Sequence, residues 1–134
     1  MKKKASCIVI LNDKREIVLQ KRSNNPNIFF SGYWGMFGGA ALENESAEEC
    51  IKREFYEETG YNIKEIKYLF QIEEHCIESV YLGFIKSETI LKCYEGERIE
   101  AFTFSELSQL NISEYHRKII ENVKKNYLYM NDSI

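Results

Sequence analysis

A glutamate-rich segment between Gly39 and Tyr61 constrains the fold more than any other part of the chain. Its spacing predicts a single helix. Ser46 is a favourable N-cap, Glu49 three residues later completes a capping box, and Gly60 is placed to end the helix. At about 100° per residue, one arc of this helix carries the apolar side chains of Ala47, Cys50, Ile51 and Phe55.

Three of the glutamates, Glu54, Glu57 and Glu58, fall within or beside this apolar arc. Like charges at this spacing destabilise a helix, and a buried unpaired charge costs still more free energy. A divalent cation reverses the sign of that cost, because hard ions such as Mg²⁺ bind carboxylate oxygens. The inward orientation therefore favours a metal site over a solvated helix face, which is the usual interpretation of a glutamate-rich helix.

The spacing G-x5-E-x7-R-E-x-x-E-E-x-G resembles the signature of the Nudix hydrolases. The matching residues are Gly39, Glu45, Arg53, Glu54, Glu57, Glu58 and Gly60. Asn44 stands where many members of that family have glycine, and asparagine tolerates a left-handed backbone, so we expect the loop still to turn. Leu42 replaces a glutamate that is common in this loop.

The resemblance implies an enzyme that hydrolyses a nucleoside diphosphate linked to another group, with Mg²⁺ or Mn²⁺ as cofactor. It implies that Glu57 and Glu58 ligate the metal and that Glu54 either ligates it or takes a proton from water. It also implies that the carbonyl of Gly38 is a backbone ligand and that Arg53 orients the glutamates by ion pairing.

A further acid often comes from a loop after the motif, and the segment 94–97 is the expected place. Glu95 ranks above Glu97 and Glu100, because Glu95 precedes a glycine that permits a close approach. The alternative is that all three acids are solvated surface residues.

The substrate must be held by residues outside the motif. Phe29 and Tyr33 belong to an aromatic cluster just before it, and aromatic faces stack on nucleobases. Arg22 ends a predicted strand near that loop and is a candidate phosphate contact. The alternative for each aromatic residue is a role in the core or in anchoring the loop.

The order of the remaining elements predicts an α+β fold. We expect strands at 6–11, 17–22, 66–72, 80–85 and 100–104, and a final helix capped by Ser113 with an apolar stripe. The resemblance implies more: a Nudix-type α/β/α sandwich with a mixed sheet between helices, formed by a single domain over residues 1–134.

Composition narrows the possible partners. A net charge of −3 disfavours a long nucleic acid, and no apolar run is long enough to span a bilayer. The N-terminal region does not have the pattern of a signal peptide, so we expect a cytoplasmic protein, either a monomer or a homodimer. The four cysteines lack zinc-site spacing, and His75 and His116 are assigned neither to metal nor to catalysis.

The leading hypothesis is a metal-dependent pyrophosphohydrolase that acts on a small nucleotide. A nucleoside triphosphate, including an oxidised one, ranks slightly ahead of a nucleotide sugar, because the chain has only 134 residues. The alternative from another class is a non-hydrolytic nucleotide-sensing module of the same fold, although such a module has no need of Glu54, Glu57 and Glu58. A third hypothesis, RNA end processing, requires a basic surface that the composition does not supply.

Overall fold

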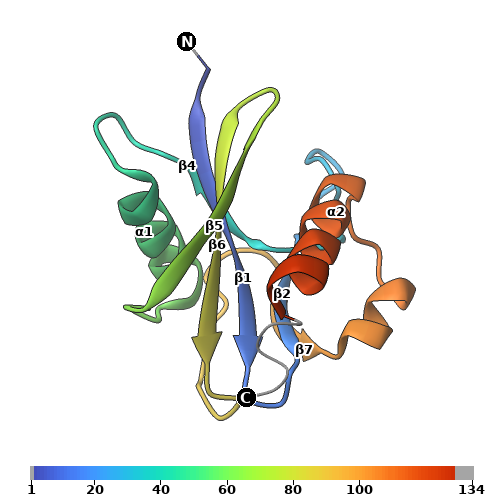
Figure 1. The fold of residues 1–134 in the computed structure, drawn as a ribbon. Coiled ribbons are helices and arrows are strands. Elements are labelled where there is room, and N and C mark those ends of the chain that lie inside the picture. The colour runs from blue at the N-terminus through green and yellow to red at the C-terminus, as the bar shows by residue number, and fades with distance from the viewer. Residues whose placement is uncertain (1, 129–134) are drawn as a thin grey trace.

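A mixed β-sheet lies between helices on its two faces (Figure 1). The computed structural model describes residues 2–128. The strands are β1 (Lys4–Asn12), β2 (Ile17–Lys21), β3 (Trp34–Gly35), β4 (Phe37–Ala40), β5 (Ile66–Glu73), β6 (Ile77–Ile85) and β7 (Arg98–Phe102). The helices are α1 (Ala47–Thr59), the 3₁₀ helix η1 (Phe104–Gln109), α2 (Glu114–Val123) and the π-helical segment η2 (Lys124–Leu128). The predicted α+β sandwich is confirmed.

Strand β1 is the centre of the sheet, whose main order is β3-β2-β1-β6-β5. It pairs antiparallel with β2 and β4 and parallel with β6. Successive side chains of a strand point to opposite faces. Cys7 and Val9 therefore join the core beneath α2, whereas Ile8 and Ile10 join the core beneath α1. Burial on both faces explains why this strand reads as an unbroken apolar run.

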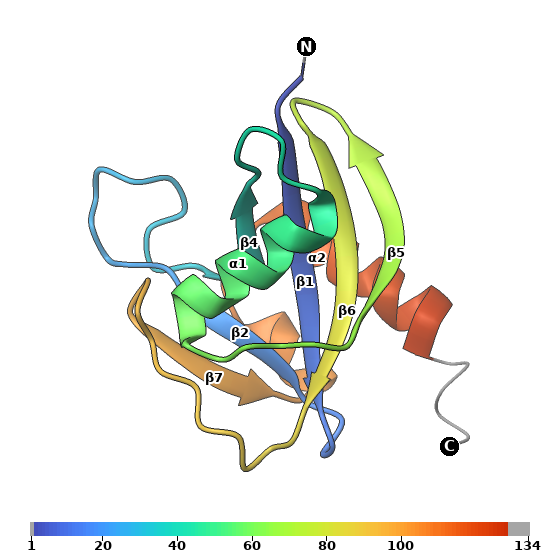
Figure 2. The same ribbon diagram turned by 90° about the vertical axis from the view of Figure 1, so that its left-hand side faces the viewer.

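Helix α1 begins and ends at the predicted residues. The hydroxyl of Ser46 accepts a hydrogen bond from the N–H of Glu49 at 3.1 Å, and the Glu49 carboxylate accepts one from the N–H of Ser46 at 2.9 Å. Gly60 ends the helix in the left-handed conformation, with φ of 75°. Helix α1 lies across one face of the sheet (Figure 2). Phe55 of α1 packs edge-on against Phe37 of β4, with the ring centroids 5.0 Å apart, and this contact fixes α1 on the sheet.

The loop before α1 turns as expected, because Asn44 adopts a left-handed backbone with φ of 66°. Other predictions need correction. No strand was predicted for the residues just before the motif helix, but Trp34–Gly35 and Phe37–Ala40 form the short strands β3 and β4, which pair with β2 and β1. Strand β6 begins at Ile77 and not at residue 80, because Ile77 pairs with Lys4 of β1. Strand β7 covers Arg98–Phe102 and not 100–104, because its register is set by pairing with β2.

Helix α2 covers the other face of the sheet. Its N-cap is Ser113, as predicted, and the hydroxyl of Ser113 accepts a hydrogen bond from the N–H of His116 at 3.2 Å. The expected apolar stripe is buried at Ile119, Ile120 and Val123. Over residues 2–128, no helix combines the length and the apolar character that crossing a membrane requires.

Candidate active site and metal centre

Three carboxylates converge beside the C-terminal half of α1. Glu54 and Glu58 lie one helical turn apart on α1, and Glu95 comes from the loop between β6 and β7. One oxygen of each carboxylate lies within 4.8 Å of the others. This oxygen-only donor set suits Mg²⁺ or Mn²⁺, because both ions prefer carboxylate, carbonyl and water ligands.

The electrostatics of this trio fit a bound cation. Burial, together with the negative charges of Glu95 and Glu54, raises the pKa of Glu58 to about 9. Burial also raises the pKa of Glu54, although the neighbouring Arg53 opposes that shift. In the absence of a cation, Glu58 therefore holds a proton at neutral pH. A divalent ion supplies the positive charge that allows all three carboxylates to be ionised together.

Arg53 connects three glutamates of the motif. Its Nε and Nη2 atoms donate to the two oxygens of Glu45 at 2.7 and 3.0 Å. Its Nη1 atom donates to Glu54 at 3.0 Å and to Glu57 at 3.1 Å. This forked geometry is specific to a guanidinium group. Glu45 also accepts a hydrogen bond from the N–H of Leu42 at 2.9 Å, so it anchors the loop before α1.

Glu57 differs from the expected inward orientation. Its side chain is 54% exposed, whereas the Glu58 residue is only 4% exposed. The reason is geometric: Glu57 lies about 100° around the helix axis from Glu58 and so falls on the flank of the buried arc. Its contact with Arg53 holds it near the trio, and its role as a metal ligand stays a prediction.

Strand β4 carries two glycines that fit closely around the helix acids. The N–H of Gly38 donates to Oε1 of Glu58 at 3.2 Å, which joins β4 to α1. A Cβ atom added at Gly39 would lie 2.5 Å from the carboxylate carbon of Glu54, so only glycine leaves room for that carboxylate. Metal ligation by the Gly38 carbonyl stays a prediction.

Two hydrogen bonds hold the backbone around Glu95 in place. The side-chain amide of Gln20 in β2 donates to the carbonyl of Glu95. On the other side, the N–H of Tyr94 donates to the carbonyl of Glu58 at 3.0 Å. These contacts bring the Glu95 carboxylate towards the helix acids, even though Glu58 and Glu95 are far apart in the sequence.

The two other candidate acids of this region lie elsewhere. Glu97 approaches the ammonium group of Lys21 at 4.0 Å, and Glu100 pairs with Arg98 at 3.3 Å. Within residues 2–128, the carboxylates grouped with Glu54 and Glu58 include Glu95 and neither of these two.

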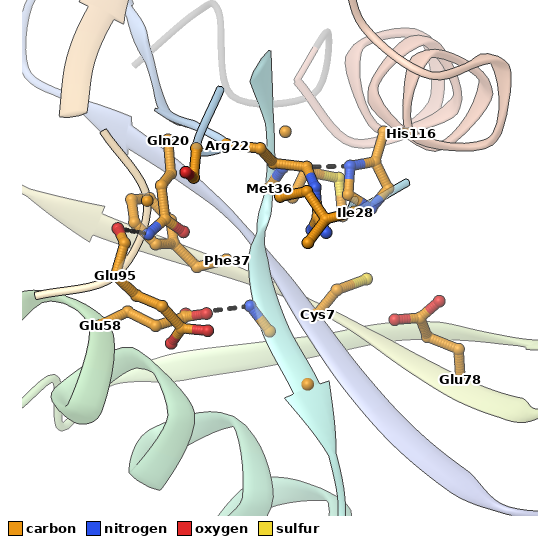
Figure 3. Close-up of a pocket in the computed structure, with 15 residues that line it drawn as sticks. Cys7, Gln20, Arg22, Ile28, Met36, Phe37, Glu58, Glu78, Glu95 and His116 are labelled. Atoms are coloured by element: carbon orange, nitrogen blue, oxygen red, sulfur yellow. Dashed lines mark hydrogen bonds between the residues drawn. The ribbon is translucent and has the colours of Figure 1, made fainter. Parts of the chain in front are cut away.

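A cavity of about 480 Å³ extends from the carboxylates into the protein, a size typical of small-molecule sites (Figure 3). In Figure 3, Glu58 and Glu95 lie on one side of β4, whereas Glu78 and His116 lie on the other. The lining residues include Cys7, Gln20, Arg22, Ile28, Met36, Phe37, Gly38, Gly39, Glu58, Glu78, Glu95 and His116.

The three predicted substrate contacts differ in position. Arg22 lines the cavity, and its Nε atom also donates to the carbonyl of Phe29 at 3.0 Å. Among the described residues, the lining of this cavity includes neither Phe29 nor Tyr33. Phe29 is 87% exposed, and Tyr33 packs against Phe30 with the ring centroids 5.3 Å apart. Substrate contact by these residues stays a prediction.

Glu78 and His116 are two polar residues of the cavity that the sequence did not single out. Glu78 falls in a segment predicted to connect two strands, and His116 falls in the apolar stripe of the last helix. Burial, together with the charge of Arg22, lowers the pKa of His116 to about 4, so its ring is neutral at pH 7. No local signal marks either residue, because the pairing of β6 with β1 and the packing of α2 bring them to the cavity.

Comparison with known proteins identifies the family. A family model described as the NUDIX domain matches residues 1–123. A protein of Bacillus subtilis (strain 168), provisionally named an 8-oxo-dGTP diphosphatase, is 42% identical over 55 residues, which are 41% of this chain and 33% of that protein. The chain thus spans about a third of the length of this relative.

A second relative matches over most of the chain. The ADP-ribose pyrophosphatase of Methanocaldococcus jannaschii is 29% identical over 121 residues, which cover 84% of this chain and 68% of that protein. Among solved structures, a MutT protein from a study of the Aliivibrio salmonicida and Vibrio cholerae enzymes superposes with a TM-score of 0.78 at 20% identity. That match covers 95% of this chain and 100% of the MutT chain, and it confirms the fold.

Proposed function

The chain belongs to the NUDIX family, and from this premise we propose that it is a metal-dependent pyrophosphohydrolase acting on a nucleotide. In this proposal, water cleaves a diphosphate bond between a nucleoside phosphate and another group. The observation that carries the proposal is the trio of Glu54, Glu58 and Glu95 at one end of a nucleotide-sized cavity.

The residues of the trio are suited to hold Mg²⁺ or Mn²⁺, and the Gly38 carbonyl and Glu57 are proposed as additional ligands. A bound divalent cation stabilises charge on the phosphoryl group and lowers the pKa of a coordinated water. Arg53 holds Glu54 in place through a 3.0 Å hydrogen bond. Glu54 is the proposed proton acceptor if it does not ligate metal, because its raised pKa suits a general base.

For the substrate we propose a nucleoside triphosphate, including oxidised forms such as 8-oxo-dGTP. The name of the Bacillus subtilis relative supports this choice. ADP-ribose is the second candidate, because the Methanocaldococcus jannaschii relative, which matches over 84% of this chain, is an ADP-ribose pyrophosphatase. A net charge of −3 supports a small nucleotide over a long nucleic acid as partner.

A hydrolysis screen tests this function. The purified protein is incubated with Mg²⁺ or Mn²⁺ and with nucleoside triphosphates, 8-oxo-dGTP or ADP-ribose, and the release of nucleoside monophosphate is measured. We expect turnover that EDTA abolishes and that Glu58→Gln reduces strongly. Turnover that survives full chelation contradicts the metal mechanism. Tight nucleotide binding without turnover of any member of the panel favours the sensing module instead.

A further inference from the structure

Two further polar residues, Glu78 and His116, lie at the end of the cavity away from the carboxylate trio. Glu78 comes from β6 and His116 from α2, and both line the cavity (Figure 3). Neither residue belongs to the Nudix motif or contacts the three acids of the trio. A nucleotide whose phosphates lie at the trio would direct its base towards this end.

Glu78 is a buried carboxylate with spare capacity to accept hydrogen bonds. It is 9% exposed, and the hydroxyl of Tyr115 donates to its Oε1 atom at 2.5 Å. The buried thiol of Cys7 lies close by, and the charge of Glu78 adds to the effect of burial in raising the pKa of that thiol. Among residues 2–128, no cationic side chain forms an ion pair with Glu78. A carboxylate offers about four lone-pair positions, so the single neutral donor of Tyr115 leaves room for donors from a ligand.

His116 supplies a donor to the same cavity. Its Nδ1 atom lies 3.2 Å from the backbone nitrogen of Met36, and a backbone N–H can only donate, so Nδ1 carries the lone pair. The neutral ring therefore has its proton on Nε2. Within the described part of the chain, the Nε2 atom makes no hydrogen bond. Every buried side-chain nitrogen or oxygen in that part has a hydrogen-bond partner, so an atom without one, such as Nε2, is not buried. Nε2 is thus an accessible donor.

We propose, on the basis of the proposed function, that Glu78 and His116 recognise the Watson–Crick edge of a guanine-type base. This edge presents O6 as an acceptor, followed by N1–H and the exocyclic amino group as two adjacent donors. The two Glu78 oxygens accept from the two donors, and the Nε2–H group of His116 donates to O6. Ile28 and Met36 line the cavity and provide apolar contact for the base.

This arrangement discriminates against other bases. Adenine presents its amino group as a donor next to N1, which is an acceptor. The N1 lone pair would therefore face the buried carboxylate of Glu78, and the carboxylate would lack a hydrogen-bond donor. A site built to hydrogen-bond one pattern rejects ligands that leave its buried polar groups unpaired. Inosine keeps N1–H and O6 but lacks the exocyclic amino group, so it isolates the contribution of one carboxylate contact.

Binding of nucleoside monophosphates tests the proposal without any hydrolysis. We expect titration calorimetry to give a Kd for GMP about tenfold lower than for IMP, as for the loss of one good hydrogen bond to a charged group. AMP should bind more weakly than IMP. In Glu78→Gln, one carboxylate oxygen becomes an amide donor, so the difference between GMP and IMP should disappear and AMP should gain relative to both.

Two further variants separate recognition from a structural effect. His116→Ala removes the donor to O6, which GMP and IMP share, so it should weaken both equally and preserve their ratio. Glu74→Gln makes the same chemical change at an exposed position outside the cavity and should alter none of the three affinities. The proposal is overturned if wild-type protein binds AMP as tightly as GMP, or if Glu78→Gln weakens all three ligands by one common factor.

Hydrolysis assays separate this inference from the proposed function. The values of kcat/KM are compared for dGTP, 8-oxo-dGTP, dITP and dATP with saturating Mg²⁺. Selective GMP binding without hydrolysis of any of these triphosphates or of ADP-ribose would overturn the proposed function and support the base site. Hydrolysis without base preference would support the proposed function and overturn the base site. Since dGTP and 8-oxo-dGTP share the edge described above, Glu78→Gln should lower kcat/KM for both by a similar factor, and unequal factors would count against the shared edge.

Discussion

The backbone N–H of Gly38 lies 3.2 Å from Oε1 of Glu58 and donates a hydrogen bond to it. This bond connects strand β4 to helix α1 at Glu58, the buried glutamate of the helix. A hydrogen bond of this kind favours the ionised carboxylate, but burial acts more strongly in the opposite direction and raises the pKa of Glu58 to about 9. The metal-free protein therefore contains a protonated Glu58 at neutral pH.

This raised pKa predicts that the metal-free protein loses stability as the pH rises. Between the ordinary pKa of 4.5 and about 9, the native state binds more protons than the unfolded state, so the free energy of unfolding falls with pH. For one group, the slope is at most about 1.4 kcal/mol per pH unit. Urea denaturation in EDTA at pH 7 and pH 8.5 measures it. This range lies above the ordinary pKa of 6.5 of His116, whose own shift is downward.

Glu58→Gln is the matched variant for this measurement. It cannot ionise, so it should lose most of the slope and should be more stable than wild type at pH 8.5 without metal. An unchanged slope in the variant would show that Glu58 is not the group responsible.

Mg²⁺ should reverse the stability order of these two proteins. A ligand that binds only the native state stabilises it by about 2.7 kcal/mol at a concentration of one hundred times its Kd. Wild-type protein should therefore show a clear rise in Tm with Mg²⁺, and Glu58→Gln a much smaller one. Tm is measured for both proteins without Mg²⁺ and at Mg²⁺ concentrations that increase in tenfold steps. Equal increases in Tm for both proteins would place the ion elsewhere.

Arg53→Ala should reduce activity by displacing the glutamates that Arg53 holds. Its hydrogen bonds of 2.7 to 3.1 Å fix Glu45, Glu54 and Glu57. Because a displacement of about 1 Å can cost on the order of 100-fold in rate, we expect a loss of kcat of that order, with Mg²⁺ binding retained. The control is Lys52→Ala on the same helix, since Lys52 pairs with Glu48 on the exposed face. Similar kcat values for the two variants would contradict the positioning role.

Much of the motif helix was predictable, because its signals are local. The capping box of Ser46 and Glu49 and the left-handed Gly60 depend on residues a few positions apart. Periodicity also identified Glu54 and Glu58 as inward-facing residues. It placed Glu57 too close to the buried arc, because the width of that arc depends on how the helix packs on the sheet.

The end of the cavity that holds Glu78 and His116 was not predictable, because it also depends on how distant segments pack. Glu78 reaches it because β6 pairs parallel with β1, where Glu78 lies opposite Ala5. His116 reaches it because its ring lies beside Gly35 of β3 and accepts a hydrogen bond from the N–H of Met36, the residue between β3 and β4. These are contacts between segments that are distant in the sequence, and no periodic pattern within either segment reports them.

Gly39→Ala tests whether the close fit around Glu54 matters for activity. The added Cβ atom would lie 2.5 Å from the carboxylate carbon of Glu54, so the carboxylate must move. We expect kcat to fall at least tenfold while Tm changes little, because the displaced group is the end of a side chain. The crystal structure or Mg²⁺ affinity of the variant checks the displacement. Wild-type kcat in Gly39→Ala would mean that the position of Glu54 is not critical.

The last prediction concerns the loop acid. Glu54 and Glu58 approach a bound cation from the helix, whereas Glu95 approaches from the loop between β6 and β7, and its backbone is held by Gln20. If Glu95 is a ligand, Glu95→Ala should lower kcat at least tenfold at saturating Mg²⁺. At pH 8.5, where Glu58 begins to ionise, the same change should stabilise the metal-free protein, because the charge of Glu95 is one cause of the raised pKa of Glu58.

The control for Glu95→Ala is Glu97→Ala in the same loop. Glu97 approaches Lys21 only at 4.0 Å on the surface, and exposed pairs of this kind contribute little to stability. We therefore expect this variant to keep near-wild-type kcat and Tm. Initial rates over a range of Mg²⁺ concentrations compare the two variants. If both turn over at the wild-type rate, Glu95 does not belong to the metal site, and the helix acids alone must bind the ion.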